Sequence, residues 1–328
     1  MYIVNHRGLF FAITGIILAI AVGAILFLHL PLSIDFTGGS LVQVTYTAPR
    51  PDTVLLQKNL AALNLGEVSL LPSGTNDVTL RARTLTPAEH TQALAVLSEN
   101  GKAALTEDRF TSIGPSLGTQ LGQKALWAIL AVIVAIVLYI AWAFRRVSKP
   151  VSSWIYGVTV VAILVHDIII PAGFYAILAH FTGAQVDSLF AVALLAILGY
   201  SVNDTIVIFD RVREHLAHNI REHIVEPFEE TVGKSITETL GRSINTSLTV
   251  VLALLALAFV GSAATVNFAI VLLVGVVAGT YSSILLAAPL LVPLAKAFAK
   301  DANISLSDKK GSKEKKMVNR TEKKSGKK

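Results

Sequence analysis

Ionisable side chains lie inside three long apolar stretches of this sequence. His166 and Asp167 are neighbours in one stretch, Asp204 lies within the next, and Arg242 begins the one after it. A charge at membrane depth costs about 2.5–3.5 kcal/mol on insertion scales, so such residues are candidates for function. A nearby cation favours an ionised carboxyl group and desolvation favours a protonated one, so a carboxyl that alternates between the two environments carries a proton. We therefore predict a proton relay at Asp204 and Arg242, with His166, Asp167 and Asn203 as further members.

Polar residues near Asp204 support this prediction but leave an alternative open. Hydroxyl and amide groups at a similar depth are Asn203, Asn245, Thr246, Ser247 and Thr249. A wet proton path needs such groups. A static ion pair, surrounded by polar contacts between helices, would use the same residue types. The sequence is therefore compatible with both a proton path and a static ion pair.

The composition indicates a membrane protein. Hydrophobic residues make up 53% of the chain and charged residues only 15%, and the mean hydropathy is +0.63. A soluble domain carries about a quarter charged residues, so the apolar excess must face lipid. The absence of cysteine excludes disulfides, thiolate metal sites and cysteine nucleophiles. The net charge of +6 is concentrated near the C-terminus, which suits contact with an anionic membrane surface or ribosomal RNA.

Six apolar segments are long enough to cross a hydrocarbon core of about 30 Å, which takes roughly 20 helical residues. The expected spans are residues 9–30, 125–144, 151–179, 188–209, 243–260 and 267–295. We expect the first to be a retained signal anchor, because its apolar run exceeds the ~7–15 residues of a secretory signal core. In the last, Gly275 and Gly279 have the spacing of closely packed helices.

Lysine and arginine in the short loops predict the orientation. Basic residues occur between the second and third expected spans and between the fourth and fifth, whereas loops 180–187 and 261–266 contain none. Both termini are therefore expected in the cytoplasm, with the long segment 31–124 outside.

This topology divides the chain into four regions. They are the N-terminus and first span (1–30), an external domain (31–124), a five-helix membrane region (125–298) and a lysine-rich cytoplasmic tail (299–328). Within the third region, residues 211–242 are expected to be a cytoplasmic amphipathic segment, with a helix at 211–226 that lies on the membrane surface. The tail is expected to be disordered and to contact anionic lipid or a ribosome, unless it only aids solubility.

The external segment alternates strand and helix signals. Strands are expected at residues 40–46, 68–71, 78–83 and 103–113, and helices at 51–63 and 86–100. The second helix has Thr86 as N-cap, Pro87 at its first position and Gly101 beyond its end. The order β-α-β-β-α-β is typical of a ferredoxin-like α+β module. We expect it to contact another protein, and a passive spacer is the alternative.

Two motif-like signals in the sequence do not indicate a nucleotide-binding site or a metal site. Gly233-Lys234-Ser235 looks like the end of a phosphate-binding loop, but that motif needs a glycine where this chain has Phe228. His215 and His218 share a helix face, but no fixed carboxylate pattern accompanies them. We therefore expect no cofactor, no metal site and no enzymatic activity.

Four longer stretches form specific motifs. Residues 34–39 read Ile-Asp-Phe-Thr-Gly-Gly, and residues 114–118 read Gly-Pro-Ser-Leu-Gly. Residues 199–213 read Gly-Tyr-Ser-Val-Asn-Asp-Thr-Ile-Val-Ile-Phe-Asp-Arg-Val-Arg, and residues 242–247 read Arg-Ser-Ile-Asn-Thr-Ser. Together with the His166-Asp167 pair, these motifs resemble those of the SecD/SecF family of protein-export membrane subunits. The resemblance covers residues 1–300 and leaves out the lysine-rich tail.

The resemblance implies a membrane fold of the resistance-nodulation-division type, in which two six-span halves pair around a pseudo-twofold axis. It implies SecD as the other half, and the SecYEG channel and YajC as further partners in the bacterial plasma membrane. It also implies a role late in polypeptide export, driven by the proton-motive force. By position, Asp204 and Arg242 correspond to the family's proton-relay pair. Structural motif residues are implied at Asp35, Phe36, Gly38, Gly39, Gly199, Asp210 and Arg211.

Two other classes of function stay open. Half of a proton-coupled small-molecule transporter would carry a much larger external funnel than segment 31–124 provides. A purely structural scaffold for the channel would not need an ionisable Asp204, so replacing that residue with asparagine would leave export intact. A membrane enzyme is disfavoured, because the sequence has no recognisable arrangement of nucleophile, base and metal ligands.

Overall fold

The computed structural model describes residues 2–73, 75–144, 153–261 and 263–297. Six helices in these ranges are long and apolar enough to cross a membrane. They are α2 (Arg7–Leu28), α6 (Pro115–Ala143), α7 (Ser153–Thr182), α8 (Ser188–Arg221), α9 (Phe228–Val260) and α10 (Ala263–Ser282). The last span continues through a π-helical segment, η1 (Ser283–Ala287), to Ala297. The predicted polytopic helical fold is confirmed; residues 151–152 of the third expected span and the tail 299–328 lie outside the described residues.

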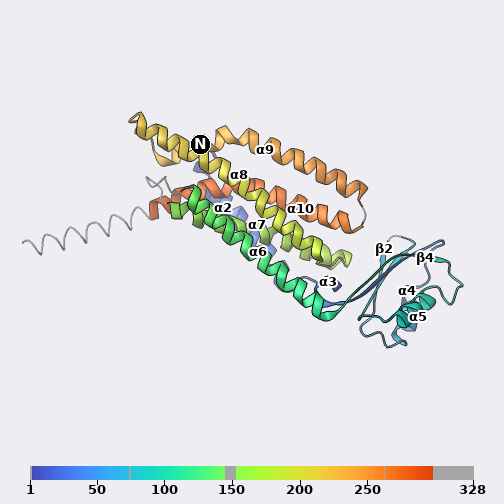
Figure 1. The fold of residues 1–328 in the computed structure, drawn as a ribbon. Helices are drawn as coiled ribbons and strands as arrows, with labels where there is room; N and C mark the ends of the chain where they lie inside the picture. The colour runs from blue at the N-terminus through green and yellow to red at the C-terminus, as the bar shows by residue number, and fades with distance from the viewer. Residues whose placement is uncertain (1, 74, 145–152, 262, 298–328) are drawn as a thin grey trace, which may run out of the picture.

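The long helices lie side by side in one bundle, with the sheet and its two helices at one end (Figure 1). The short N-terminal helix α1 (Tyr2–Asn5) lies at the opposite end (Figure 1). At least half of the apolar part of α7, α8 and α10 is buried, whereas α2, α6 and α9 leave most of theirs exposed. The interior is therefore built from α7, α8 and α10, and any site within the bundle depends on these three helices.

The segment between the fourth and fifth spans differs from its expected form. It is not a separate amphipathic helix on a membrane surface, because α8 runs unbroken to Arg221 and α9 already begins at Phe228. The 34 residues of α8 extend about 51 Å at 1.5 Å per residue, well beyond a hydrocarbon core of about 30 Å. The expected amphipathic segment is thus a helical hairpin that continues both spans.

The external domain has the predicted order of elements. Its strands β1 (Gly39–Tyr46), β2 (Ser69–Ser73), β3 (Asp77–Ala82) and β4 (Leu105–Ile113) form one antiparallel sheet in the order β2-β3-β1-β4, and its helices are α4 (Thr53–Ala61) and α5 (Pro87–Leu97). This order is the ferredoxin-like arrangement. The predicted cap of α5 is present: Thr86 accepts from the backbone of Glu89, and the Glu89 carboxylate accepts from the backbone N–H of Thr86 at 2.8 Å. Leu60 and Leu97 pack with Val42 of the sheet in one buried core.

Glycines allow the external domain and the membrane helices to meet. The short helix α3 (Ile34–Thr37) packs on α6. Gly38 has a φ of +76°, which other residues rarely adopt, and a Cβ on it would lie 2.6 Å from the Cα of Pro115. A Cβ on Gly118 of α6 would lie 2.6 Å from the backbone nitrogen of Gly38. The two segments therefore touch backbone to backbone.

Phe36 and Gly39 extend this contact on both sides. The ring of Phe36 covers Gly122 of α6, where a Cβ would lie 3.5 Å from its edge. A Cβ on Gly39 would lie 2.7 Å from the carbonyl oxygen of Ala82 on β3. The glycine motif after the first span thus packs against α6 on one side and the sheet on the other.

Close packing also brings α10 onto α8. A Cβ on Gly275 would lie 2.1 Å from Cδ1 of Ile197, and a Cβ on Gly279 would lie 3.0 Å from the Cβ of Ser201. The helix contact expected from these two glycines is confirmed, and it brings the middle of α10 beside the middle of α8.

We predict that Gly118→Ala destabilises the protein. The added methyl group would overlap the backbone of Gly38, which cannot rotate away as a side chain can, so overpacking should cost about 1–3 kcal/mol. The measurement is the thermal unfolding midpoint of the detergent-purified protein. Gly157→Ala on α7 is the matched control, because a Cβ there meets nothing within 4 Å. An equal loss in both variants would contradict the proposed contact.

Candidate proton-binding site within the membrane helices

Asp167 lies at the centre of the bundle. It stands near the middle of α7 and is 0% exposed. Its Oδ2 accepts hydrogen bonds from the hydroxyls of Ser201 on α8 and Ser282 at the end of α10, the latter at 3.1 Å. Its Oδ1 lies 2.7 Å from Nδ1 of His166. Three helices therefore supply polar partners to one carboxyl group, which offsets the cost of burying it.

His166 connects this carboxyl group to Tyr281 of α10. The imidazole is 4% exposed, and its Nε2 lies 2.8 Å from the Tyr281 hydroxyl. The two rings meet edge to face, with centroids 5.4 Å apart. A continuous row of hydrogen bonds thus runs from Tyr281 through His166 to Asp167.

Asp204 is a second buried carboxyl group. It follows Ser201 by one helical turn on α8 and is 5% exposed. Its Oδ2 and the Oγ of Ser243 on α9 are both buried, and neither has a hydrogen-bond partner among the described residues. Ser243 is the polar neighbour that acts on Asp204 across the helix interface, and the charge of Arg242 acts on it as well. Protonation of Asp204 would supply a donor that the Ser243 hydroxyl can accept.

The expected ion pair between Asp204 and Arg242 does not occur among the described residues. Arg242 and Asn203 are both exposed. Asn203 directly precedes Asp204 on α8, and Arg242 directly precedes Ser243 on α9. Successive residues of a helix are rotated by about 100° around its axis. Because the two helices are antiparallel, this rotation turns Arg242 and Asn203 to the same side of the helix pair, away from the contact between Asp204 and Ser243.

An exposed polar stripe therefore marks this side of α8 and α9. We define it as Gly199, Asn203, Arg242, Asn245, Thr246 and Thr249, all of which are exposed. The hydroxyls of Thr246 and Thr249 bond to the backbone of their own helix at 2.9 and 2.7 Å. A side chain on Gly199 would meet open space. Polar side chains at membrane depth are costly in contact with lipid, so a stripe of this kind needs a covering partner or water.

The outer end of α8 is held by two aspartates. Asp35 of α3 accepts hydrogen bonds from the backbone and hydroxyl of Ser188, at 2.9 and 2.7 Å. Asp187 caps α8 by accepting from the backbone N–H of Phe190 at 2.9 Å. Burial, helped by the nearby charge of Asp35, raises the pKa of Asp187. Arg81 of β3 and Asp187 line the same cavity of about 230 Å³. The Nε of Arg81 is buried and has no hydrogen-bond partner in the described part of the chain.

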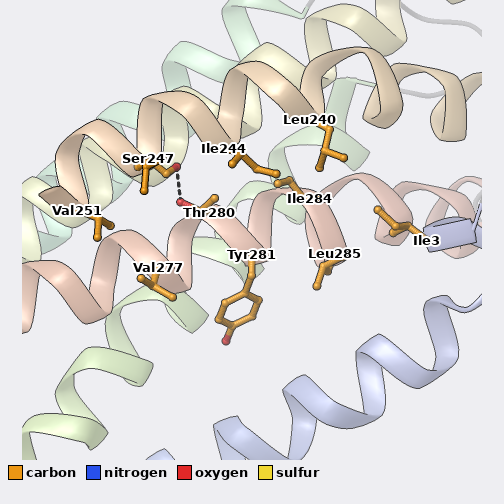
Figure 2. Close-up of a pocket in the computed structure, with 11 residues that line it drawn as sticks. Ile3, Leu240, Ile244, Ser247, Val251, Val277, Thr280, Tyr281, Ile284 and Leu285 are labelled. Atoms are coloured by element: carbon orange, nitrogen blue, oxygen red, sulfur yellow. Dashed lines mark hydrogen bonds between the residues drawn. The ribbon is translucent and has the colours of Figure 1, made fainter.

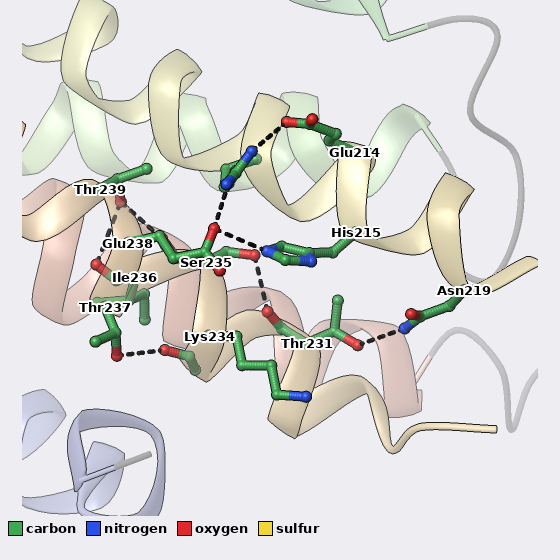
Figure 3. Close-up of polar contacts among 12 residues, drawn as sticks. Glu214, His215, Asn219, Thr231, Lys234, Ser235, Ile236, Thr237, Glu238 and Thr239 are labelled. Atoms are coloured by element: carbon green, nitrogen blue, oxygen red, sulfur yellow. Dashed lines mark hydrogen bonds and ion pairs between the residues drawn. The ribbon is translucent and has the colours of Figure 1, made fainter. Parts of the chain in front are cut away.

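Asp210 and Arg211 lie on the part of α8 that forms the hairpin with α9. The guanidinium of Arg211 bonds to Glu238 of α9 at 2.5 Å, and His215 contacts the same carboxylate at 3.0 Å (Figure 3). Asp210 pairs with Arg213 on its own helix at 3.0 Å. Arg211 therefore fastens the hairpin, whereas Asp210 pairs within α8, and neither bonds to a buried carboxyl group among the described residues.

The hairpin contacts also explain the two motif-like signals of the sequence. Lys234 and its glycine and serine neighbours stand inside α9, and Lys234 pairs with Glu226. His215 pairs with Glu238 of α9 (Figure 3). Within the described ranges, no group of three or more histidine or carboxylate side chains could hold a metal ion.

Sequence reasoning missed four members of the site. Ser201, Ser243, Tyr281 and Ser282 are not ionisable, and a serine or tyrosine within an apolar helix is a common packing residue. Ser201 and Ser243 do lie within the motifs of residues 199–213 and 242–247. Tyr281 and Ser282 stand in the last span, where only the spacing of Gly275 and Gly279 gave a signal.

Six spans around buried carboxyl groups, with a small domain inserted after the first span, define a polytopic membrane transport protein. The model of the family described as protein export membrane protein SecD/SecF, C-terminal, matches residues 93–297, and that of the SecD/SecF GG motif matches residues 23–49. The chain belongs to the SecD/SecF family, and its role is that of an auxiliary subunit of the Sec translocase.

Relatives named protein translocase subunit SecF are similar along nearly their whole length. The protein from Anaerolinea thermophila is 37% identical over 294 residues, covering 88% of this chain and 92% of that protein. The protein from Thermobaculum terrenum is 37% identical over 300 residues, with the same two coverages of 88% and 92%.

Solved structures of SecDF share the fold. The crystal structure of SecDF from Thermus thermophilus, described as a translocon-associated membrane protein, has a TM-score of 0.75 and 30% identity, and the match covers 90% of this chain. SecDF in its super-membrane-facing form has a TM-score of 0.63 and 30% identity over 92% of this chain. In both cases the match spans 39% of the SecDF chain, so this protein corresponds to less than half of that polypeptide.

We predict that Asp187→Asn stabilises the protein at neutral pH. The pKa of Asp187 is raised in the folded state, so its contribution to stability is full at acid pH and is lost as the pH rises through that raised pKa. Asparagine caps a helix as well as aspartate does, so the variant keeps the cap without this loss. Thermal unfolding midpoints between about pH 4 and about pH 8 test this. We expect the advantage of the variant to shrink towards acid pH; a constant difference would contradict the prediction.

Proposed function

We propose that this subunit uses the proton-motive force to promote late steps of polypeptide export. The observation that carries the proposal is the presence of two carboxyl groups, Asp167 and Asp204, buried in the middle of the bundle. Ser201 bonds to the first and lies one turn before the second on α8. Protonation changes the free energy of a buried carboxyl group strongly, because only the charged form needs full solvation or pairing.

Protonation of Asp204 is the step that changes contacts between helices. As a carboxylate it has an oxygen with no hydrogen-bond partner among the residues that the structure describes, and it attracts the charge of Arg242. As a neutral acid it loses that attraction and donates a hydrogen bond to Ser243. Both changes act across the interface of α8 and α9, so we infer that these helices shift relative to each other.

The outer end of α8 transmits this shift to the external domain. Asp35 bonds to Ser188, so α3 follows the end of α8. The contact between Gly38 and Gly118 then links α3 to α6, and α3 leads directly into β1. We infer that the external domain moves with this linkage and grips or releases the emerging polypeptide.

SecD is the proposed partner half. In the chain alone the exposed polar stripe would face lipid, at a cost that a second membrane half would remove. Gly199 lies on the same stripe and leaves room for a helix to approach closely. The matched SecDF chain is also more than twice as long as the part this chain covers, 39% of it, which is consistent with a second half.

Family membership supports the remaining partners. SecYEG and YajC are the proposed neighbours, and the plasma membrane of a bacterium is the proposed location. Both termini are proposed to be cytoplasmic, because the two short loops on the side of the external domain lack lysine and arginine. The tail 299–328, which lies outside the described residues, is proposed to contact anionic lipid or a ribosome through its lysines.

We predict that Asp204→Asn abolishes the part of export that depends on the proton-motive force. The amide has nearly the shape of the carboxyl group but cannot bind and release a proton. The assay is export of a reporter preprotein in cells that carry only the variant subunit, with and without a protonophore. Abundance is checked by immunoblot.

Glu222→Gln is the control, because Glu222 is an exposed carboxylate at the end of α8 that pairs with the adjacent Arg221. We expect this variant to export normally. Proton-dependent export that persists in both Asp204→Asn and Asp167→Asn would contradict the proposal and favour a scaffold. Proton flux lost without any change in export would favour a small-molecule transporter.

We predict that a cysteine at Asn245 cross-links to SecD. The chain has no cysteine of its own, so a thiol-reactive photocross-linker attaches at one place only. Ile16→Cys is the control, because Ile16 is also exposed but lies on α2, outside the stripe. A SecD adduct from Asn245→Cys and none from Ile16→Cys is expected. Adducts from both variants, or from neither, would count against the stripe as the interface.

A further inference from the structure

Three consecutive residues of α10 each contact a different part of the bundle. The hydroxyl of Thr280 lies 2.7 Å from that of Ser247 on α9. Tyr281 bonds to Nε2 of His166 at 2.8 Å, and Ser282 bonds to Asp167 at 3.1 Å. Figure 2 shows the bond between Ser247 and Thr280, and the ring of Tyr281 projecting from α10 away from α9. This short segment therefore connects the carboxyl site of Asp167 with the helix that faces Asp204.

The backbone of α10 departs from regular helix packing on both sides of this segment. Before it, Gly279 lies so close to Ser201 that an added Cβ would approach within 3.0 Å. After it, the helix becomes π-helical over Ser283–Ala287. Short π-helical segments are rare and occur frequently at functional sites. Both features fix where Tyr281 and Ser282 stand relative to α7.

The charge state of Asp167 determines the tautomer of His166, because the two hydrogen bonds of the ring take their direction from it. An ionised carboxylate only accepts hydrogen bonds, so the Nδ1 that faces Asp167 carries a hydrogen. In a neutral imidazole Nε2 then has no hydrogen and accepts one from the Tyr281 hydroxyl. Without that hydroxyl, Nε2 would be a buried acceptor with no partner, and the tautomer that points a hydrogen at Asp167 would lose its advantage.

We propose that Tyr281 is a positioning residue of the proton relay, which holds His166 in the tautomer that donates to Asp167. The inference rests on the proposed use of protons at the buried carboxyl groups. One proton added at Nε2 gives an imidazolium ion beside the carboxylate. Transfer of the Nδ1 hydrogen to Oδ1 of Asp167 then gives a neutral imidazole beside a neutral acid, with the same number of protons.

In both protonated forms Nε2 carries a hydrogen, so the Tyr281 hydroxyl must turn from donor to acceptor. Tyr281 is also one of the residues that line the apolar groove between α9 and α10. Its neighbour Thr280 is bonded to α9. A change of protonation at His166 thus alters contacts on α10 that continue to α9, the helix that carries Ser243.

The test is the tautomer of His166 in Tyr281→Phe, which removes the hydroxyl and keeps the ring. Nitrogen-15 histidine-labelled protein in lipid vesicles is measured by solid-state NMR, where the two tautomers have different nitrogen shifts. The His166 signals are identified by their loss in His166→Asn. We expect the Nδ1–H tautomer in the unmodified protein, and a mixture or the Nε2–H tautomer in Tyr281→Phe.

Tyr156→Phe is the matched control. Tyr156 is a buried tyrosine of α7 in the same bundle, and its hydroxyl has no hydrogen-bond partner among the described residues. Removing that hydroxyl should leave both the His166 tautomer and export unchanged. Ser282→Ala removes one partner of Asp167 but leaves Tyr281 in place, so it should also keep the Nδ1–H tautomer.

Export supplies the second readout. We expect the proton-dependent export of a reporter preprotein to fall several-fold in Tyr281→Phe at normal subunit abundance. If the tautomer is unchanged in Tyr281→Phe, the positioning role is overturned, regardless of how Asp167→Asn exports. The role is also overturned if Tyr281→Phe changes the tautomer but exports normally, while Asp167→Asn abolishes export. Normal export in Asp167→Asn and Asp204→Asn instead overturns the proposed function itself.

Discussion

A polar group in the hydrocarbon region has no water to bond with, so it must find partners inside the protein. Asp167 meets this constraint with two serine hydroxyls and an imidazole from three helices. Gly279 lets α10 lie directly against α8, where Ser282 and Ser201 bond to the same oxygen of Asp167. The close helix packing, the π-helical segment and the burial of α7 are therefore linked to the requirements of one carboxyl group. Asp204 meets the same constraint incompletely, because its buried Oδ2 has no hydrogen-bond partner in the described part of the chain.

The contacts at the two ends of the bundle differ in kind. At the outer end, glycines bring backbone against backbone at α3 and α6, and Asp35 of α3 bonds to the exposed Ser188 of α8. Contacts of this kind transmit small displacements, because packed backbone does not yield as a flexible side chain does. The hairpin of α8 and α9 is held by exposed ion pairs such as Arg211 with Glu238, and exposed pairs contribute little stability. A shift of α8 is thus passed on most directly towards the external domain.

Much of the architecture was predictable from local signals. Apolar runs long enough to cross lipid gave the six spans, and strand and helix periodicity gave the external domain, including the cap at Thr86. The hairpin was not predictable in this form, because residues 211–242 are amphipathic and an amphipathic helix suits either a membrane surface or the side of another helix. Only the continuity of α8 and α9 through this segment distinguished the two.

The sequence by itself determined which residues carry charge at membrane depth, since hydropathy and residue type are local properties. His166, Asp167 and Asp204 were identified in this way, and all three are buried. Only the tertiary structure decided which side chains meet them. Arg242 and Ser243 are adjacent in the sequence, yet a helical rotation of about 100° leaves Arg242 exposed and turns Ser243 towards Asp204. Tyr281 lies more than a hundred residues from His166, so their contact depends entirely on how α7 and α10 pack.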